Sequence, residues 1–146
     1  SDVYKRQHVL LIDDNATDLL LATEAFLELD ATVGVDTFAS GQHALDHLRA
    51  TPQDALPDVI ILDINMPVLN GFDVLSQLKD DPALQLIPVV MLSTSDYLGD
   101  VTRAYSMHAS SYLIKSRSFT EFVQQVDAFL VYWRSVILAR QTDSPQ

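Results

Sequence analysis

The chain contains no cysteine, and it has only 9 lysines and arginines against 20 aspartates and glutamates. Without a thiol it can form no disulfide, no thiolate nucleophile and no zinc–thiolate site, and this absence fits the reducing cytoplasm in which we expect the protein. The formal net charge of −11 repels phosphate backbones, so we expect no binding to nucleic acid. No apolar run approaches the roughly 18 residues that span a bilayer, so we expect no membrane segment.

Phosphate-binding glycine loops are also missing. Neither G-x-x-x-x-G-K-[ST] nor G-x-G-x-x-G occurs in the sequence. Residues 1–7 lack the apolar core of a signal peptide and look unrelated to the rest of the chain, so we expect a stub that is not native. No two histidines have ligand spacing with a third donor nearby, and we interpret all of them as ordinary: His8, His43, His47 and His108.

Short apolar segments alternate with helix-length segments along the 146 residues, a length that fits one domain. The expected strands are residues 9–12, 32–36, 59–62, 89–92 and 112–114. Buried strands separated by helices predict a parallel sheet with helices on both faces. We therefore expect an α/β protein of the doubly wound, flavodoxin-like (βα)5 class, with strand order 2-1-3-4-5 and an extended C-terminal helix.

Polar side chains stand where four of these strands end. They are Asp13, Asp14, Asp63, Ser93 and Lys115. Ligands of doubly wound sheets bind at the carboxyl ends of the strands, next to the point where the strand order reverses. We therefore expect these side chains to line one crevice.

Three carboxylates a few ångströms apart cannot all stay ionised without a countercharge. Lys115 can supply one cation, and Mg²⁺ can supply the other, because it takes oxygen ligands and suits sites with one or two carboxylates. A carboxylate neutralised in this way can attack the phosphorus of a phosphoryl donor while the cations stabilise the equatorial oxygens. The pattern predicts an aspartyl phosphate.

The segments LLIDDN, ILDINMPVLNGFD, IPVVMLSTS and YLIK resemble the receiver domain of two-component response regulators. The resemblance covers residues 8–133 and leaves residues 134–146 as a helix extension and tail. It implies a phospho-accepting signalling switch rather than a turnover enzyme. The chemistry that it implies is autophosphorylation from small donors and autodephosphorylation.

The resemblance also implies a role for each matching residue. Asp63 is the expected phospho-acceptor and a ligand of Mg²⁺. Asp14 would bind the ion directly, Asp13 would bind it through water, and Asn65 would offer its backbone carbonyl. Lys115 would pair with the phosphoryl oxygens.

The resemblance assigns the switch to Ser93, whose hydroxyl would bond the phosphoryl group, and to Tyr112, whose rotamer would follow. Two positions depart from the family pattern. Ser116 stands where the family has a proline joined by a cis bond, so both cis and trans remain open for the Lys115–Ser116 bond. Thr94 stands where the family often has alanine or glycine, and its branched side chain would narrow access to the acyl phosphate.

The partner that the resemblance implies is a sensor histidine kinase, which would dock over the first helix near Asn15, Ala16 and Leu19. The YW and SYLIKS segments are similar to those of stand-alone receivers that partner bacterial phytochromes. The last helix is apolar on several sides, which predicts a covering surface. We expect a homodimer there, although a tail that folds back on its own domain remains an alternative. The expected dimer residues are Tyr132, Trp133, Val136 and Ile137.

Two other functions remain open. A Mg²⁺-dependent phosphohydrolase with an aspartyl intermediate typically needs a second aspartate two residues after the nucleophile, where this chain has Asn65. A flavodoxin-like cofactor binder would need a hydroxyl-rich and glycine-rich loop after the first strand. That loop here is Asp13-Asp14-Asn15-Ala16, which repels phosphate.

Overall fold

The computed structural model describes residues 7–94, 97–115, 121–125, 127–128, 131–132 and 135. The elements are β1 (His8–Ile12), α1 (Ala16–Leu29), β2 (Gly34–Phe38), α2 (Gly41–Ala50), a 3₁₀ turn (Gln53–Ala55), β3 (Val59–Asp63), α3 (Gly71–Asp80), β4 (Val89–Ser93), α4 (Leu98–Ser106) and β5 (Ser111–Ile114). The described residues from 121 onward are helical. Residues 1–6, Trp133, Val136, Ile137 and the Lys115–Ser116 bond lie outside the described residues.

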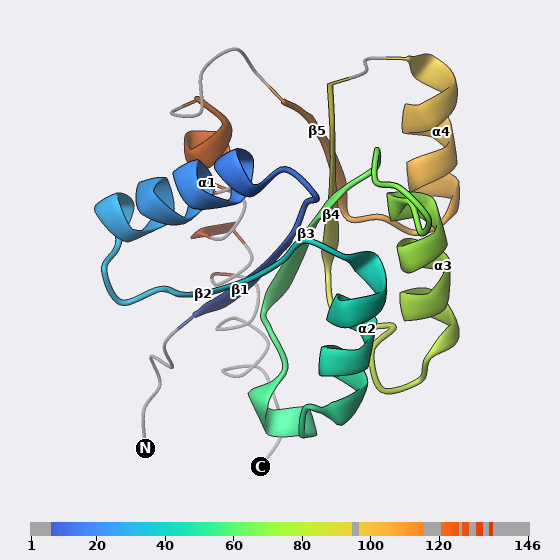
Figure 1. Cartoon of the computed structure of the whole chain (residues 1–146), viewed down its shortest axis with the longest axis horizontal. Helices are drawn as coiled ribbons and strands as arrows, with labels where there is room; N and C mark the ends of the chain where they lie inside the picture. The colour runs from blue at the N-terminus through green and yellow to red at the C-terminus, as the bar shows by residue number, and fades with distance from the viewer. Residues whose placement is uncertain are drawn as a thin grey trace.

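The strands form one parallel sheet in the order β2-β1-β3-β4-β5, which confirms the predicted topology. Figure 1 shows α1 and the helical residues after 120 on one side of the sheet and α2, α3 and α4 on the other. The reversal of strand order lies between β1 and β3, so the crevice between their carboxyl ends is the position where such sheets bind ligands.

The core has two parts because both faces of the sheet are covered. On one face, strand residues such as Leu10, Ile60 and Met91 pack against α2, α3 and α4. On the other face, strand residues such as Leu11 and Ile61 pack against α1 and residues 122 and 123. Successive strand side chains point to opposite faces, so a strand buried on both faces must be apolar throughout. The buried strands β1, β3 and β4 therefore place their polar side chains at the edge of the sheet where the crevice lies.

The second strand begins two residues later than predicted. The β-branched run suggested residues 32–36, but β2 spans Gly34–Phe38. Asp30 closes a turn before it, since its carboxylate accepts hydrogen bonds from the Thr32 N–H at 2.9 Å and from the Thr32 hydroxyl at 2.6 Å. Aspartate favours such local turns, and this one delays entry into the sheet.

Gly71 begins α3 where the helix backbone passes closest to the end of β3. A Cβ atom at this position would lie 2.4 Å from the Asp63 carbonyl oxygen and 2.7 Å from the Ile64 Cα. Both neighbours are backbone atoms at the end of a buried strand, so neither can turn aside.

We predict that Gly71→Ala lowers the free energy of unfolding by about 1–3 kcal/mol, because the extra methyl group must push backbone apart. Urea denaturation of the two proteins measures the difference. Gly99→Ala is the matched control, because the three atoms nearest to a Cβ there belong to the Tyr97 side chain, which is 67 % exposed, and none of them is a backbone atom. Equal stability of Gly71→Ala and wild type would contradict the close approach.

Candidate functional site

The register of the sheet brings the polar strand ends together. The Cα partners are Ile12 with Leu62, Asp63 with Leu92, and Ser93 with Ile114. Asp13 therefore lies level with Asp63 across β1 and β3, and Lys115 follows directly after the residue paired with Ser93. The strand ends for which we predicted a common crevice therefore lie side by side at one edge of the sheet.

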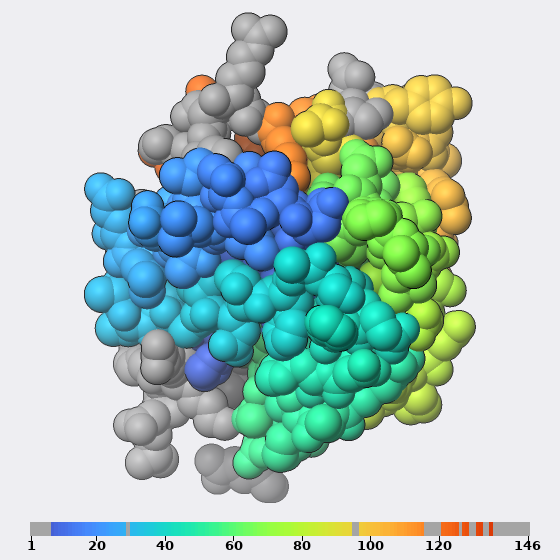
Figure 2. Space-filling view, viewed as in Figure 1, coloured from blue at the N-terminus to red at the C-terminus, as the bar shows by residue number. Residues whose placement is uncertain are grey.

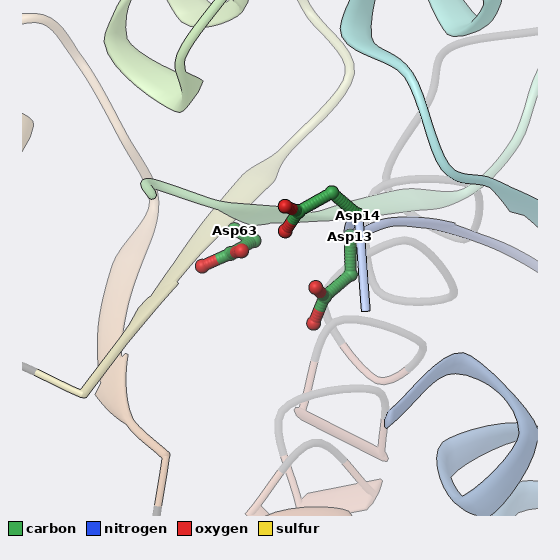
Figure 3. A group of neighbouring side chains, drawn as sticks. All are labelled: Asp13, Asp14 and Asp63. Atoms are coloured by element: carbon green, nitrogen blue, oxygen red, sulfur yellow. The ribbon is translucent and has the colours of Figure 1, made fainter. Parts of the chain in front are cut away.

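Three carboxylates meet in this crevice. Asp13 and Asp14 follow β1 directly, and Asp63 is the last residue of β3 (Figure 3). Each offers an oxygen that lies within 4.8 Å of the other two. Asp13 and Asp63 are buried, whereas Asp14 is exposed. The group thus reaches solvent through Asp14.

Lys115 brings a positive charge from the end of β5. Its Nζ lies 2.8 Å from Asp13 Oδ2, 3.0 Å from Asp18 Oδ2 and 3.8 Å from Asp63 Oδ1. Its backbone N–H donates to the Ser93 carbonyl at 2.6 Å, which fixes where the side chain begins. Burial works to lower the pKa of Lys115, but the hydrogen bonds to Asp13 and Asp18 and the charge of Asp63 outweigh it, so the pKa is raised and the ammonium keeps its charge.

The pKa of the Asp63 carboxyl is strongly raised. Burial of its carboxylate and the charge of Asp13 raise its pKa from 3.8 to about 7, although Lys115 and the Asn65 N–H act to lower it. The ionised form is therefore unfavourable, because Asp63 shares one ammonium with Asp13 and Asp18 and also lies beside the carboxylate of Asp14.

This excess of negative charge fits a divalent metal ion. The three clustered carboxylates offer only oxygen ligands, the donor type that hard cations take. The Asn65 backbone follows Asp63 by two residues, and its N–H already donates to Asp63 Oδ1 at 3.3 Å. The donor set suits Mg²⁺, Mn²⁺ or Ca²⁺ and offers nothing to a soft metal.

Ser93 closes the crevice beside Asp63. The residue is fully buried, and its hydroxyl accepts a hydrogen bond from the Asn65 side-chain amide at 3.4 Å. Thr94, the next residue, is exposed. Tyr112 is partly buried and packs against the core under α2, α3 and α4. The predicted switch residues thus lie on β4 and β5, one beside the acids and one nearer the helix layer.

A cavity of about 240 Å³ opens next to the acids on the α1 side of the sheet. Its polar lining comes from Asp13, Asp18, Thr94 and Lys115, and its apolar lining includes Leu19. The surface of α1 borders the segment that follows β3 in Figure 2. Solvent and ligands can therefore reach the site from the α1 side.

The residues predicted to dock a kinase lie around the first turn of α1. Asn15 caps the helix, and its side chain accepts a hydrogen bond from the Asp18 N–H at 3.1 Å. Ala16 is exposed, and Leu19 is partly buried against the core. Of the predicted dimer residues, Tyr132 is 64 % exposed, and the others lie outside the described residues.

Asp18 is the site residue that the sequence did not reveal. Its place three residues after Asn15 is typical of a helix cap, yet its carboxylate binds Lys115. The sequence did contain a hint of this contact. An acid in the first helical turn after Asp13 and Asp14 can face back toward the strand ends. The pattern alone could not separate this contact from ordinary capping.

Comparison with known proteins agrees with this geometry. The description of the matching family is response regulator receiver domain, and the match covers residues 9–127. A relative named "Probable methanogenesis regulatory protein FilR2", from Methanothrix harundinacea, is 39 % identical over 127 residues, which are 86 % of this chain and 82 % of that protein. Response regulator Rcp1 from Synechocystis sp. is 30 % identical over 132 residues, 88 % of this chain and 90 % of that protein.

Solved structures show the same fold. The phosphorylated cyanobacterial phytochrome response regulator RcpA aligns with a TM-score of 0.80 at 33 % identity, over 90 % of this chain and 96 % of that one. The Mn²⁺-bound form of Rcp1 aligns with a TM-score of 0.75 at 31 % identity, over 85 % of this chain and 94 % of that one. Among the described residues, no helix combines the length and the apolar character that crossing a membrane would require.

Neither the phosphohydrolase nor the flavodoxin-like cofactor binder is favoured by these relatives, which are signalling proteins. The acids where the strand order reverses, the parallel sheet and the family match all indicate the same family. The chain belongs to the response regulator receiver family, whose members work as phosphorylation-based signalling switches that receive their phosphoryl group from histidine kinases.

Proposed function

We propose that Asp63 is the residue that accepts the phosphoryl group and that the chain acts as a response regulator with its receiver unit at residues 8–133. The observation that supports this most strongly is the position of the Asp63 carboxylate. It is buried, lies 3.8 Å from the Lys115 ammonium, and shares the crevice with two further acids. In that setting, binding a cation stabilises the ionised carboxylate, which is the form that can attack phosphorus.

In the proposed reaction, a carboxylate oxygen of Asp63 attacks the phosphorus of a phosphohistidine on the kinase. The new oxygen–phosphorus bond forms as the nitrogen–phosphorus bond breaks, and the electron pair leaves with the histidine nitrogen. Lys115 neutralises charge on the phosphoryl oxygens. Water later attacks the phosphorus, the bond from phosphorus to the Asp63 oxygen breaks, and inorganic phosphate leaves. The carboxylate is restored, so the domain resets itself without acting as a turnover enzyme.

The proposed cofactor is Mg²⁺, held by Asp13, Asp14 and Asp63 together with the Asn65 carbonyl. Three clustered carboxylate oxygens support it, as does the Mn²⁺-bound form of the relative Rcp1. When bound, the ion supplies positive charge that stabilises the equatorial phosphoryl oxygens and offsets the repulsion among the acids.

The signal leaves the site through Ser93 and Tyr112 in our proposal. The buried Ser93 hydroxyl would turn from Asn65 toward the phosphoryl group, and Tyr112 would adjust where it packs beside α4. One added phosphoryl group would then shift the equilibrium between two conformations of the β4–α4–β5 surface. The shift would change the affinity of this surface for a partner.

The proposed partner is a phytochrome-like sensor histidine kinase in the cytoplasm, which docks on α1 around Asn15, Ala16 and Leu19. Two relatives support the phytochrome connection, because RcpA is a phytochrome response regulator and another neighbour acts in red light signalling of R. palustris. The exposed first turn of α1 lies next to the acids, where a donor histidine must arrive.

We also propose that two copies of the chain pair through the last helix, with Tyr132, Trp133, Val136 and Ile137 at the contact. Val131 and Tyr132 support this, because they are 56 % and 64 % exposed on adjacent helical positions. Large apolar side chains that stay exposed on a surface mark a candidate interface.

We predict that acetyl phosphate with Mg²⁺ adds one phosphoryl group to the protein, and that Asp63→Asn abolishes the addition because the amide is no nucleophile. Intact mass spectrometry measures the gain. Asp54→Asn, which changes an exposed acid of the 3₁₀ turn, should be labelled like the wild type. Labelling of Asp63→Asn would disprove the assigned acceptor.

Thr94 should control how long the phosphoryl group stays. It is exposed at the cavity beside Lys115, so Thr94→Ala widens the path for water and should shorten the phosphate half-life by about two- to tenfold. Loss of the phosphoryl mass over time gives the rate. Thr102→Ala, at an exposed position of α4, is the control, and an unchanged half-life in Thr94→Ala would refute this role.

The dimer predicts a mass that depends on concentration in sedimentation equilibrium. Tyr132→Asp should shift the protein to the monomer mass, because a carboxylate would lose its water at the interface. Leu86→Asp, at a residue that is 86 % exposed on the loop before β4, should leave the association unchanged. A monomer mass for the wild type at every concentration would rule out the dimer.

A further inference from the structure

Two helices of this chain begin with the same pattern and use it differently. The pattern is Asn-x-x-Asp, at Asn15–Asp18 for α1 and at Asn70–Asp73 for α3. In α3 the capping box is complete: the Asp73 N–H donates to Asn70 Oδ1 at 3.0 Å, and the Asn70 N–H donates to Asp73 Oδ2 at 3.1 Å. In α1 only the first half exists, because the Asn15 N–H donates instead to Asp13 Oδ1 at 2.9 Å.

The Asp18 carboxylate is therefore free of the cap, and it contacts Lys115. The distance from Nζ to Asp18 Oδ2 is 3.0 Å, and that to Asp13 Oδ2 is 2.8 Å. The Asp18 and Lys115 side chains are only 22 % and 18 % exposed, so solvent screens the pair weakly. An ammonium has three N–H donors, and two of them are used here.

The third donor does not reach the reactive acid. The Nζ atom lies 3.8 Å from Asp63 Oδ1, which is longer than a hydrogen bond. Lys115 is thus held between Asp13 and Asp18, at the edge of the place where a phosphoryl group on Asp63 would lie. Asp18 and that phosphoryl group would both draw on this one ammonium.

We propose that Asp18 is a positioning residue that competes with the phosphoryl group of Asp63 for Lys115; this rests on the proposed role of Asp63 as the acceptor. Before phosphorylation, Asp18 anchors the ammonium to the first turn of α1. After phosphorylation, the ammonium leaves Asp18 for a phosphoryl oxygen, which carries more negative charge.

The exchange gives α1 a direct response to phosphorylation. The contact ties the first turn of α1 to a residue 97 positions away, after β5. When it breaks, an acid at the α1 surface loses its countercharge. The surface near Asn15 and Ala16, where we place the kinase, then becomes more acidic, so phosphorylation would change its affinity for the kinase.

The test is the affinity for beryllofluoride with Mg²⁺, measured by isothermal titration calorimetry on the full chain. Asp18→Asn should bind it about three- to tenfold more tightly than the wild type, because a weaker competitor faces the ammonium. Glu24→Gln removes the same charge from an exposed position further along α1 and should match the wild type. Unchanged or weaker binding by Asp18→Asn would overturn the proposal.

A double-mutant cycle separates competition from net charge. With Lys115→Met as background, adding Asp18→Asn should change beryllofluoride affinity by less than about twofold, because no ammonium is left to compete for. Lys115→Gln provides a second background. An undiminished gain in both backgrounds would show that Asp18 acts through its charge alone, and the proposal would fail.

The controls also separate this inference from the acceptor role. Failure of the wild type to bind beryllofluoride and to gain a phosphoryl mass would overturn both. A wild type that binds and is labelled, with no gain in Asp18→Asn, would overturn the competition alone.

Discussion

Repulsion among buried carboxylates at the end of a parallel sheet is the constraint on which this site depends. Asp13 and Asp63 are buried beside each other, Asp14 completes the cluster, and Asp18 adds a fourth acid through Lys115. One ammonium cannot balance the charge of these carboxylates, so the site attracts further positive charge. That affinity serves both a divalent ion and the charge redistribution of phosphoryl transfer.

The fold creates this constraint by making the central strands apolar on both faces. Polar side chains can appear only where such a strand ends, and the register sets Asp13 level with Asp63 and places Lys115 after the partner of Ser93. The close passage of α3 at Gly71 then leaves the Asp63 backbone no room to relax. The burial of apolar side chains in the sheet thereby stabilises the fold against the repulsion among the carboxylates at its edge.

Much of this could be predicted from the sequence, because strand ends can be read directly from apolar runs. That pattern located the strands and the five polar residues at their ends, and the strand order came with the flavodoxin-like class that the pattern favoured. The start of β2 was misplaced because the turn made by Asp30 and Thr32 overrides β-branched propensity. Asp18 escaped prediction because one local pattern, Asn-x-x-Asp, has two outcomes, and a partner 97 residues away decides between them.

The pKa of the Asp63 carboxyl tests the central claim most directly. It can be followed by its side-chain carbon signal in a ¹³C NMR pH titration of the protein freed of divalent ions with EDTA. Burial and the neighbouring Asp13 charge predict a midpoint near 7 rather than 3.8, moving downward when Mg²⁺ is added because the cation favours the ionised form. A midpoint near 4 without metal, or one that Mg²⁺ leaves unmoved, would contradict the account.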